Sequence, residues 1–287
     1  MKQLKHLFIA LLLLCSIIAN AADFKVNGIY YNITDNVNKT VEVTSGTNKY
    51  TGHVSIPKSV THNGNSYSVT AIGKSGFSYC EELTGVTIPN GITSIGEHAF
   101  NECVGLTSIT IPSSVTSIGS NAFRNCTSIN NITIPNNITY IGGHTFDETP
   151  WFKNLPDGLV YLGKVLYMYK GTMPEDTHIS IKEGTTCIAG RAFAYHPELT
   201  SVTIPESVTT IGSDAFTKCT GLASIEIPNA VTTIESWAFS GCKGLTSIVI
   251  PNSITTIEGR LFDGCTNLTS VTLPNNATSI GSGLFNN

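Results

Sequence analysis

The chain has 287 residues and a formal charge of −4; 13% of its residues are charged and 41% are hydrophobic. The hydrophobic fraction is too high, and the charge too low, for an intrinsically disordered protein. Acidic residues outnumber basic ones, which argues against a protein that binds nucleic acids or anionic membrane surfaces, because such proteins need a basic patch.

Residues 1–21 have the pattern of a secretory signal peptide. Lys2 and Lys5 provide a basic start, 7–19 form an apolar run of 13 residues, and Ala19-Asn20-Ala21 is a small-residue cleavage site. This run is too short to cross a bilayer, which needs about 20 residues. We therefore expect an exported protein at the cell surface, outside the cell or in the periplasm, with no integral membrane segment. Without the two lysines, 14 basic residues face 20 acidic ones, a charge of −6.

Residues 22–71 lack the repeat that dominates the rest of the chain. Alternating apolar residues predict short strands within 24–31, 41–43 and 66–69, separated by polar turns. The first coil of a repeat protein must be covered by a polar cap. This segment is therefore expected to form an N-terminal β cap.

From residue 72 onward the chain repeats every 23 residues, in two blocks, 72–151 and 176–287. Isoleucine, phenylalanine and proline ladders share one phase, which chance does not produce. The phenylalanines are Phe77, Phe100, Phe123, Phe146, Phe193, Phe216, Phe239, Phe262 and Phe285.

The unit Leu106–Ser128 shows what one repeat encodes. Ile109 and Ile111 alternate with Thr110, as in a strand with one buried face. Pro112 ends this strand because it cannot donate a hydrogen bond to a sheet. One such unit cannot bury its apolar residues alone, but coils stacked about 4.8 Å apart can cover each other.

The unit L-T-S-I-x-I-P-x-S-V-T-x-I-G-x-x-A-F-x-x-C resembles the leucine-rich repeat of the BspA-like bacterial surface proteins. The resemblance covers 83–151 and 176–287, with a degenerate first coil near 60–82. It departs from the pattern locally, for example where Glu235 and Glu258 replace the turn glycine. The expected fold is a β-rich leucine-rich-repeat solenoid of about nine coils, with an N-terminal β cap and one β-hairpin insert. The resemblance also implies adhesion to host matrix proteins such as fibronectin or fibrinogen, or to other bacterial cells.

Residues 152–175 interrupt the repeats. Two apolar runs, 159–162 and 165–169, flank Gly163-Lys164, which is typical of a hairpin with a two-residue turn beginning in glycine. We expect a hairpin that replaces or decorates one coil and divides two shorter solenoids.

The last coil ends near Phe285 without a polar cap. An uncapped coil exposes a strand edge and core side chains. This predicts either fraying or end-to-end self-association.

Outward-facing strand positions are the first candidates for binding, because they should form one broad, repetitive face. The candidate binding residues of this face are Thr87, Thr110, Thr133, Thr203, Glu226 and Thr272. Such a face is the usual binding surface of leucine-rich repeats, which is an analogy. The alternative is that β-branched threonine simply suits an exposed strand.

Aromatic residues are the second candidates for binding. Trp237 stands where other coils carry small, polar or charged residues, so we expect it to be exposed. Tyr161, Tyr167 and Tyr169 lie together in the insert and form a candidate contact patch for a glycan. The alternative for these tyrosines is that they pack the hairpin onto the rod.

The cysteines provide no sign of chemistry. Cys80, Cys103 and Cys126 are 23 residues apart at one inward position, and Cys219, Cys242 and Cys265 repeat this in the second block. This predicts buried thiols that fill the core, rather than disulfides or metal ligands. The sequence has no C-x-x-C pair and no known catalytic motif. We therefore expect no metal, no cofactor and no enzymatic activity.

The sequence thus predicts an exported, non-enzymatic recognition module that binds a protein partner through its repetitive face. Two alternatives remain open: a structural or assembly component of the cell envelope, and a glycan-binding module that uses the insert aromatics.

Overall fold

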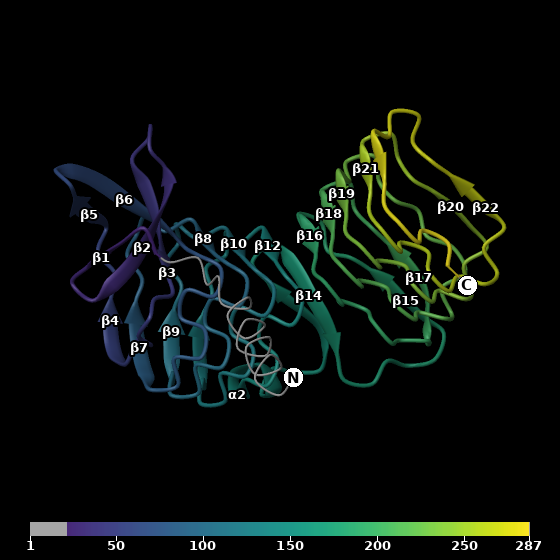
Figure 1. Cartoon of the computed structure of the whole chain (residues 1–287). Helices are drawn as coiled ribbons and strands as arrows, with labels where there is room; N and C mark the ends of the chain where they lie inside the picture. Colours follow the sequence, from purple (N-terminus) through teal and green to yellow (C-terminus); the bar gives the residue numbers. More distant parts are fainter. Residues whose placement is uncertain (1–21, 287) are drawn as a thin grey trace, which may run out of the picture.

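The structure is a computed structural model that describes residues 22–286; the predicted signal peptide, 1–21, lies outside the described residues. Figure 1 shows two stacks of coils that meet at an angle, with a notch on one side of the molecule. The described part consists of strands and turns, with a single short helix, α2 (Pro150–Lys153). The predicted β-rich repeat solenoid is therefore confirmed.

The N-terminal segment covers the first coil with a sheet of its own. Its strands are β1 (Phe24–Val26), β2 (Ile29–Asp35), β3 (Thr40–Thr44), β4 (Gly52–Ser55), β5 (Ser59–His62) and β6 (Asn65–Ile72). Strands β1, β2 and β3 are antiparallel neighbours, and β3 then pairs in parallel with β6. Strand β4 pairs in parallel with β7 (Leu83–Thr87). The coil stack therefore begins at β4, earlier than the degenerate first coil expected near 60–82 and inside the segment expected to form the cap.

Most coils carry a short inner strand, on the side that faces the notch (Figure 1). These strands are short because each buried isoleucine is followed at once by a turn. They are β8 (Ser94–Ile95), β10 (Ser117–Ile118), β12 (Tyr140–Ile141), β16 (Cys187–Ile188), β18 (Thr210–Ile211), β19 (Thr233–Ile234), β21 (Thr256–Ile257) and β23 (Ser279–Ile280).

A second, outer strand lies on the opposite side of most coils, and in most of them the repeat's proline follows it. Besides β4 and β7, these strands are β9 (Ser108–Thr110), β11 (Asn131–Thr133), β15 (Thr177–Ser180), β17 (Leu199–Thr203), β20 (Ser247–Val249) and β22 (Ser270–Thr272). All pairs between coils are parallel, because each coil follows the same path as the one before it.

The phenylalanine ladder forms the centre of the core. The rings of Phe77 and Phe100 stack with centroids 5.0 Å apart and planes 3° apart, and the spacing continues at 5.1 Å to Phe123. Each of the ladder's phenylalanines except Phe285 is buried. Between coils the backbone is equally regular, since Phe100 N–H donates to the carbonyl oxygen of Ala122 at 2.7 Å. Successive coils therefore hold each other in one register.

The cysteines also belong to this core. All seven cysteines of the described chain are free and buried, as predicted. In five coils the thiol donates to a phenylalanine carbonyl oxygen 26 residues earlier, for example Cys126 Sγ to Phe100 O at 3.0 Å. Burial raises the pKa of Cys80 to about 11 and that of Cys219 to about 12.

The insert forms the predicted hairpin, β13 (Gly158–Leu162) and β14 (Val165–Lys170). Gly163 starts its turn with a φ of 62°, and a Cβ there would lie 2.9 Å from the carbonyl oxygen of Ile138, so no side chain fits. Lys164 N–H donates to that same oxygen at 2.9 Å, and β14 pairs in parallel with β16. The start of β14 thus takes the place of an inner strand between two coils.

The bend arises where the hairpin replaces a full coil. On the inner side the flanking coils come close together, since a Cβ on Gly190 would lie 3.0 Å from the nitrogen of Gly143. On the outer side, β11 and β15 do not pair with each other. The flanking coils touch on the inner side and separate on the outer side, so the two stacks are tilted relative to each other. The buried apolar residues divide into two clusters at this point.

We predict that Phe123→Ala lowers the free energy of unfolding by about 3–5 kcal/mol, because it leaves a cavity between two stacked rings. Phe285→Ala is the matched control: it removes the same ring from the final coil, where the ring is 51% exposed. Urea denaturation followed by circular dichroism measures both changes. An equal loss for the two variants would show that ladder position does not determine the effect.

We also predict that a thiol reagent such as DTNB at pH 8 labels none of the seven cysteines in the native chain from residue 22 and all seven after unfolding. Burial raises the pKa of Cys80, Cys187 and Cys219 well above 8, so these groups stay as thiols, and the burial of all seven cysteines blocks the reagent. Rapid labelling of the native chain would contradict the buried ladder.

Candidate functional site

The predicted outward residues of the outer strands are exposed. Thr87 lies on β7, Thr110 on β9 and Thr133 on β11, while Thr203 lies on β17 and Thr272 on β22. Glu226 is exposed at the corresponding position of its coil, but that coil has no outer strand. The inward isoleucines and valines beside these positions are mostly buried, so the two-residue alternation predicted from the repeat holds here.

These residues do not form the single broad face that we expected. The inner strands form continuous ladders, from β6 to β12 and from β14 to β19, whereas the outer strands pair only two by two: β4 with β7, β9 with β11, β15 with β17, and β20 with β22. The outer strands lie on the side away from the notch, where the coils are less closely joined (Figure 1). Hollows separate the pairs, and one of about 410 Å³ lies between β7 and β9.

The coil that contains Glu226 interrupts the outer face most strongly. Residues 224–228 form no strand, although their side chains alternate between exposed and buried up to Ile227. A hollow of about 260 Å³ separates them from β17, and one of about 450 Å³ separates them from β20. Val249, at the outward position of the next coil, is 61% exposed. This coil therefore lacks the outer strand that its neighbours carry.

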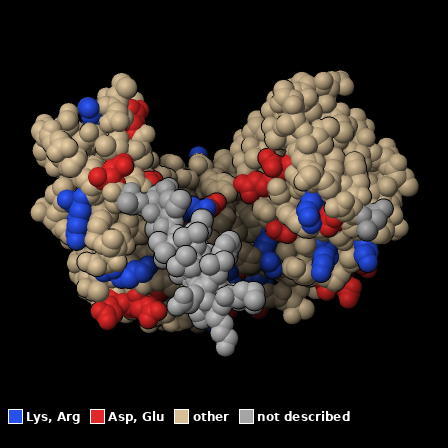
Figure 2. Space-filling view, viewed as in Figure 1, with Lys and Arg blue, Asp and Glu red and all other residues tan. Residues whose placement is uncertain are grey.

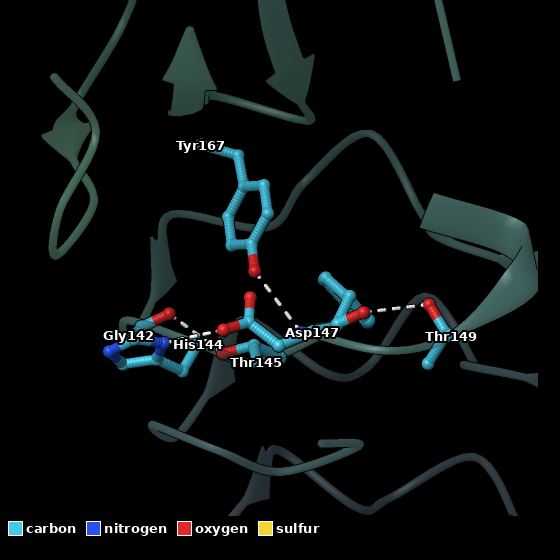
Figure 3. A network of polar contacts seen from close by, with 7 residues as sticks. Gly142, His144, Thr145, Asp147, Thr149 and Tyr167 are labelled. Atoms are coloured by element: carbon cyan, nitrogen blue, oxygen red, sulfur yellow. Dashed lines mark hydrogen bonds and ion pairs between the residues drawn. The ribbon is translucent and has the colours of Figure 1, made fainter. Parts of the chain in front are cut away.

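Tyr167 is a structural residue, which corrects its assignment as a binding residue. Only 2% of its surface is exposed, and its ring packs edge-on against Phe146 with centroids 5.4 Å apart. Its hydroxyl accepts a hydrogen bond from Phe146 N–H at 3.1 Å, the contact visible at the centre of Figure 3. In the other coils a backbone carbonyl of the next coil accepts this bond. Tyr167 therefore ends the first phenylalanine ladder.

The polar groups around this end of the ladder are also paired internally (Figure 3). Thr145 Oγ1 donates to Gly142 O at 2.7 Å and Thr149 Oγ1 donates to Phe146 O at 2.7 Å. His144 Nδ1 lies 2.5 Å from Asp147 Oδ2. These contacts pair the polar groups of the cluster with each other and with the backbone, which closes the coil.

The other two tyrosines of the insert are half-buried. Tyr161 accepts a hydrogen bond from Lys182 N–H at 3.1 Å, and the ring of Tyr169 packs edge-on against His196. Both contacts join the hairpin to the second stack. The structure thus supports the packing alternative for the insert aromatics and does not bring the three tyrosines together on an exposed patch.

Trp237 is half-buried, whereas the repeat comparison predicted an exposed side chain. The guanidinium of Arg260 lies 4.7 Å from the centre of its ring and covers it. Two coils earlier, Tyr195 is 52% exposed. The charged groups of Lys218 and Arg191 lie 5.1 and 5.3 Å from the centre of its ring. Both rings are therefore covered by cations, in two separate contacts.

Sequence reasoning missed a contact that spans the notch. Tyr140, on β12 of the first stack, donates its hydroxyl proton to Glu235 Oε1 in the second stack at 3.0 Å. The other oxygen of Glu235 accepts from Ser213 N–H at 2.9 Å. Burial and the neighbouring carboxylate raise the pKa of Tyr140, so the hydroxyl remains a donor. The sequence contained a signal for this contact, because both residues depart from the repeat. Tyr140 stands where most coils have serine or threonine, and Glu235 stands where most coils have the turn glycine.

The described residues contain no group of three or more metal-ligating side chains. None of their helices is long and apolar enough to cross a membrane. On the face shown in Figure 2, basic and acidic side chains are scattered among uncharged ones, without a continuous basic area.

Residues 48–170 and 177–287 match the family described as BspA type leucine rich repeat region, in six copies. The chain belongs to this family. The match begins at residue 48, which agrees with the early start of the coil stack at β4.

Solved structures of bacterial leucine-rich-repeat proteins are similar to this member of the BspA-type family. A leucine rich cell surface protein from Faecalibacterium prausnitzii is 24% identical, with 87% of this chain and 94% of that chain covered and a TM-score of 0.36. The pneumococcal vaccine antigen PcpA is 19% identical, with 91% and 85% covered and a TM-score of 0.43. A leucine-rich repeat protein from Bacteroides capillosus is 29% identical over 45% of this chain and 92% of that chain, with a TM-score of 0.39. No curated protein matches the chain.

We predict that Tyr140→Phe lowers the free energy of unfolding by about 1–3 kcal/mol, because the partly buried Glu235 carboxylate loses one of its two donors. Tyr79→Phe is the control, since Tyr79 is 55% exposed. Urea denaturation gives the energies, and small-angle X-ray scattering gives the shape. If both variants match the parent chain in stability and radius of gyration, the contact does not hold the bend.

Proposed function

We propose that this BspA-type chain is an exported, non-enzymatic recognition module that binds a protein partner at the bacterial cell surface or outside the cell. The observation that carries the proposal is the outer face, where exposed side chains recur once per coil on a rigid stack. The polar cluster at the end of the first phenylalanine ladder is engaged internally and with the backbone. This favours binding over catalysis, which needs converging free polar groups in a pocket.

The predicted signal peptide supports export. The resemblance to BspA-like surface proteins suggests a host matrix protein such as fibronectin or fibrinogen, or another cell, as the partner. The outer face is rich in threonine and lacks the tryptophan, tyrosine and arginine that dominate strong interfaces. Binding to it should therefore be weak for each coil and increase with the number of coils engaged.

The experiment uses the chain from residue 22 against immobilised fibronectin and fibrinogen in biolayer interferometry. We expect saturable binding that falls at least tenfold in the double variant Thr110→Lys, Thr133→Lys, which places bulky charges on the outer face. The control variant is Thr116→Lys, Thr139→Lys, which carries the same charges on exposed positions next to the inner strands. An equal effect of both variants would contradict binding through the outer face, and no binding to either protein would contradict these partners.

Two narrower alternatives remain predictions. A glycan-binding role for the insert cannot use Tyr167, which is buried, so of the three tyrosines only Tyr161 and Tyr169 could take part. Self-association through the last coil would involve Ile280 and Phe285, which are 59% and 51% exposed. A glycan array and a concentration series in analytical ultracentrifugation test these two roles.

A further inference from the structure

The outer face contains a segment whose backbone is free on both edges. Ser224, Ile225, Glu226 and Ile227 take part in no backbone hydrogen bond within the described chain, and their side chains make none either. Strands β17 and β20 lie on the two sides, but each pairs only with its far neighbour, β15 or β22. Every named outer strand, by contrast, is paired along one edge.

This segment nevertheless has the side-chain pattern of a strand. Ser224 and Glu226 are exposed, whereas Ile225 and Ile227 are only 8% and 7% exposed. The core therefore holds the segment extended, while its N–H and C=O groups remain available. Unpaired groups of this kind on an extended segment are a template for another strand.

The side chains around the segment depart from the repeat. The outward position is threonine or serine in the other coils with an outer strand between β7 and β22, but it is Glu226 and then Val249 in these two consecutive coils. Valine and threonine both suit a strand, but valine at this position leaves apolar surface in contact with water. A single exposed apolar residue needs no explanation, but this one borders the hollow beside the unpaired backbone.

The charges around the segment are uncompensated. Glu206 and Glu226 line the hollow of about 260 Å³ towards β17, and neither forms an ion pair within the described residues. Glu226 also lines the hollow of about 450 Å³ towards β20, together with Val249. No lysine or arginine lines either hollow. A partner that fits here is therefore cationic.

We propose that residues 224–227 accept an extended segment of a partner protein by strand addition, in the hollow beside β20. The segment's backbone pairs with the free N–H and C=O groups. One outward lysine or arginine of the segment lies between Glu226 and Val249, with its methylene stem against the valine and its charged head at the carboxylate of Glu226. This inference rests on the proposed protein-binding function and names the chemistry of one binding site.

The test selects a yeast-displayed library of random nine-residue peptides with the labelled chain from residue 22. The matched variant is Glu226→Thr, Val249→Thr, which restores the residue of the other coils and should unfold at the same or a higher temperature. We expect the selected peptides to share a lysine or arginine among β-prone residues and to bind the variant at least tenfold more weakly. Selection with Glu226→Lys should instead enrich acidic peptides.

A synthetic copy of a selected peptide separates strand addition from simple charge attraction. Methylation of alternate backbone amides removes its donors and keeps its charge, so we expect at least a tenfold loss of binding. Equal binding of the methylated peptide, equal binding to the consensus-restoring variant, or the absence of any enriched basic peptide would each overturn the proposal.

The same double variant distinguishes this site from the general function. If the parent chain binds fibronectin or fibrinogen and Glu226→Thr, Val249→Thr binds them equally, the strand-addition site fails while the recognition function stands. If the parent chain selects basic peptides and binds neither matrix protein, the site stands and those partners fail.

Discussion

The stacking of one coil on the next, in a fixed register of 23 residues, is the interaction on which the rest of this structure depends. Aromatic rings, thiols and backbone groups use that register together: Phe100 stacks on Phe123, Cys126 donates to Phe100 O, and Phe100 N–H donates to Ala122 O. Each coil alone is too small to bury its apolar side chains. Stability therefore resides in the contacts between coils, and a residue matters according to how many neighbouring coils it touches.

The hairpin insert shows how this register can be interrupted without exposing the core. Phe146 and Phe193, on the two sides of the insert, are 47 residues apart, which is two repeat lengths plus one residue. The insert therefore replaces one full coil, and the repeats resume after it. Val165 pairs with Cys187 on the inner side, and Tyr167 closes the first phenylalanine ladder with its ring and its hydroxyl. The two flanking coils lie close together on the inner side and are unpaired on the outer side, and this difference bends the rod. Tyr140 and Glu235 then join the two stacks across the notch.

Departures from the repeat are the informative positions in such a protein. A regular coil satisfies the fold with threonine outside and isoleucine inside, so those residues report little about a partner. Glu235 departs from the pattern and serves the bend. Glu226 and Val249 depart from it as well, but they lie beside backbone groups that no other coil satisfies. We therefore assign Glu235 to the architecture, because the fold uses it. We propose a role in recognition for Glu226 and Val249, because they lie beside unpaired backbone groups.

The sequence by itself determined the solenoid, the hairpin, the buried thiols and the exposure of residues such as Thr110, because these follow from local periodicity and from the side on which each residue falls. It did not determine where the coils separate. Whether outer strands pair depends on how closely neighbouring coils approach on that side, and a single repeat does not specify this approach. For the same reason Tyr167, placed in an aromatic cluster by sequence, became a core residue, and Tyr140 found its partner 95 residues away. Only the tertiary structure decides contacts that join different coils.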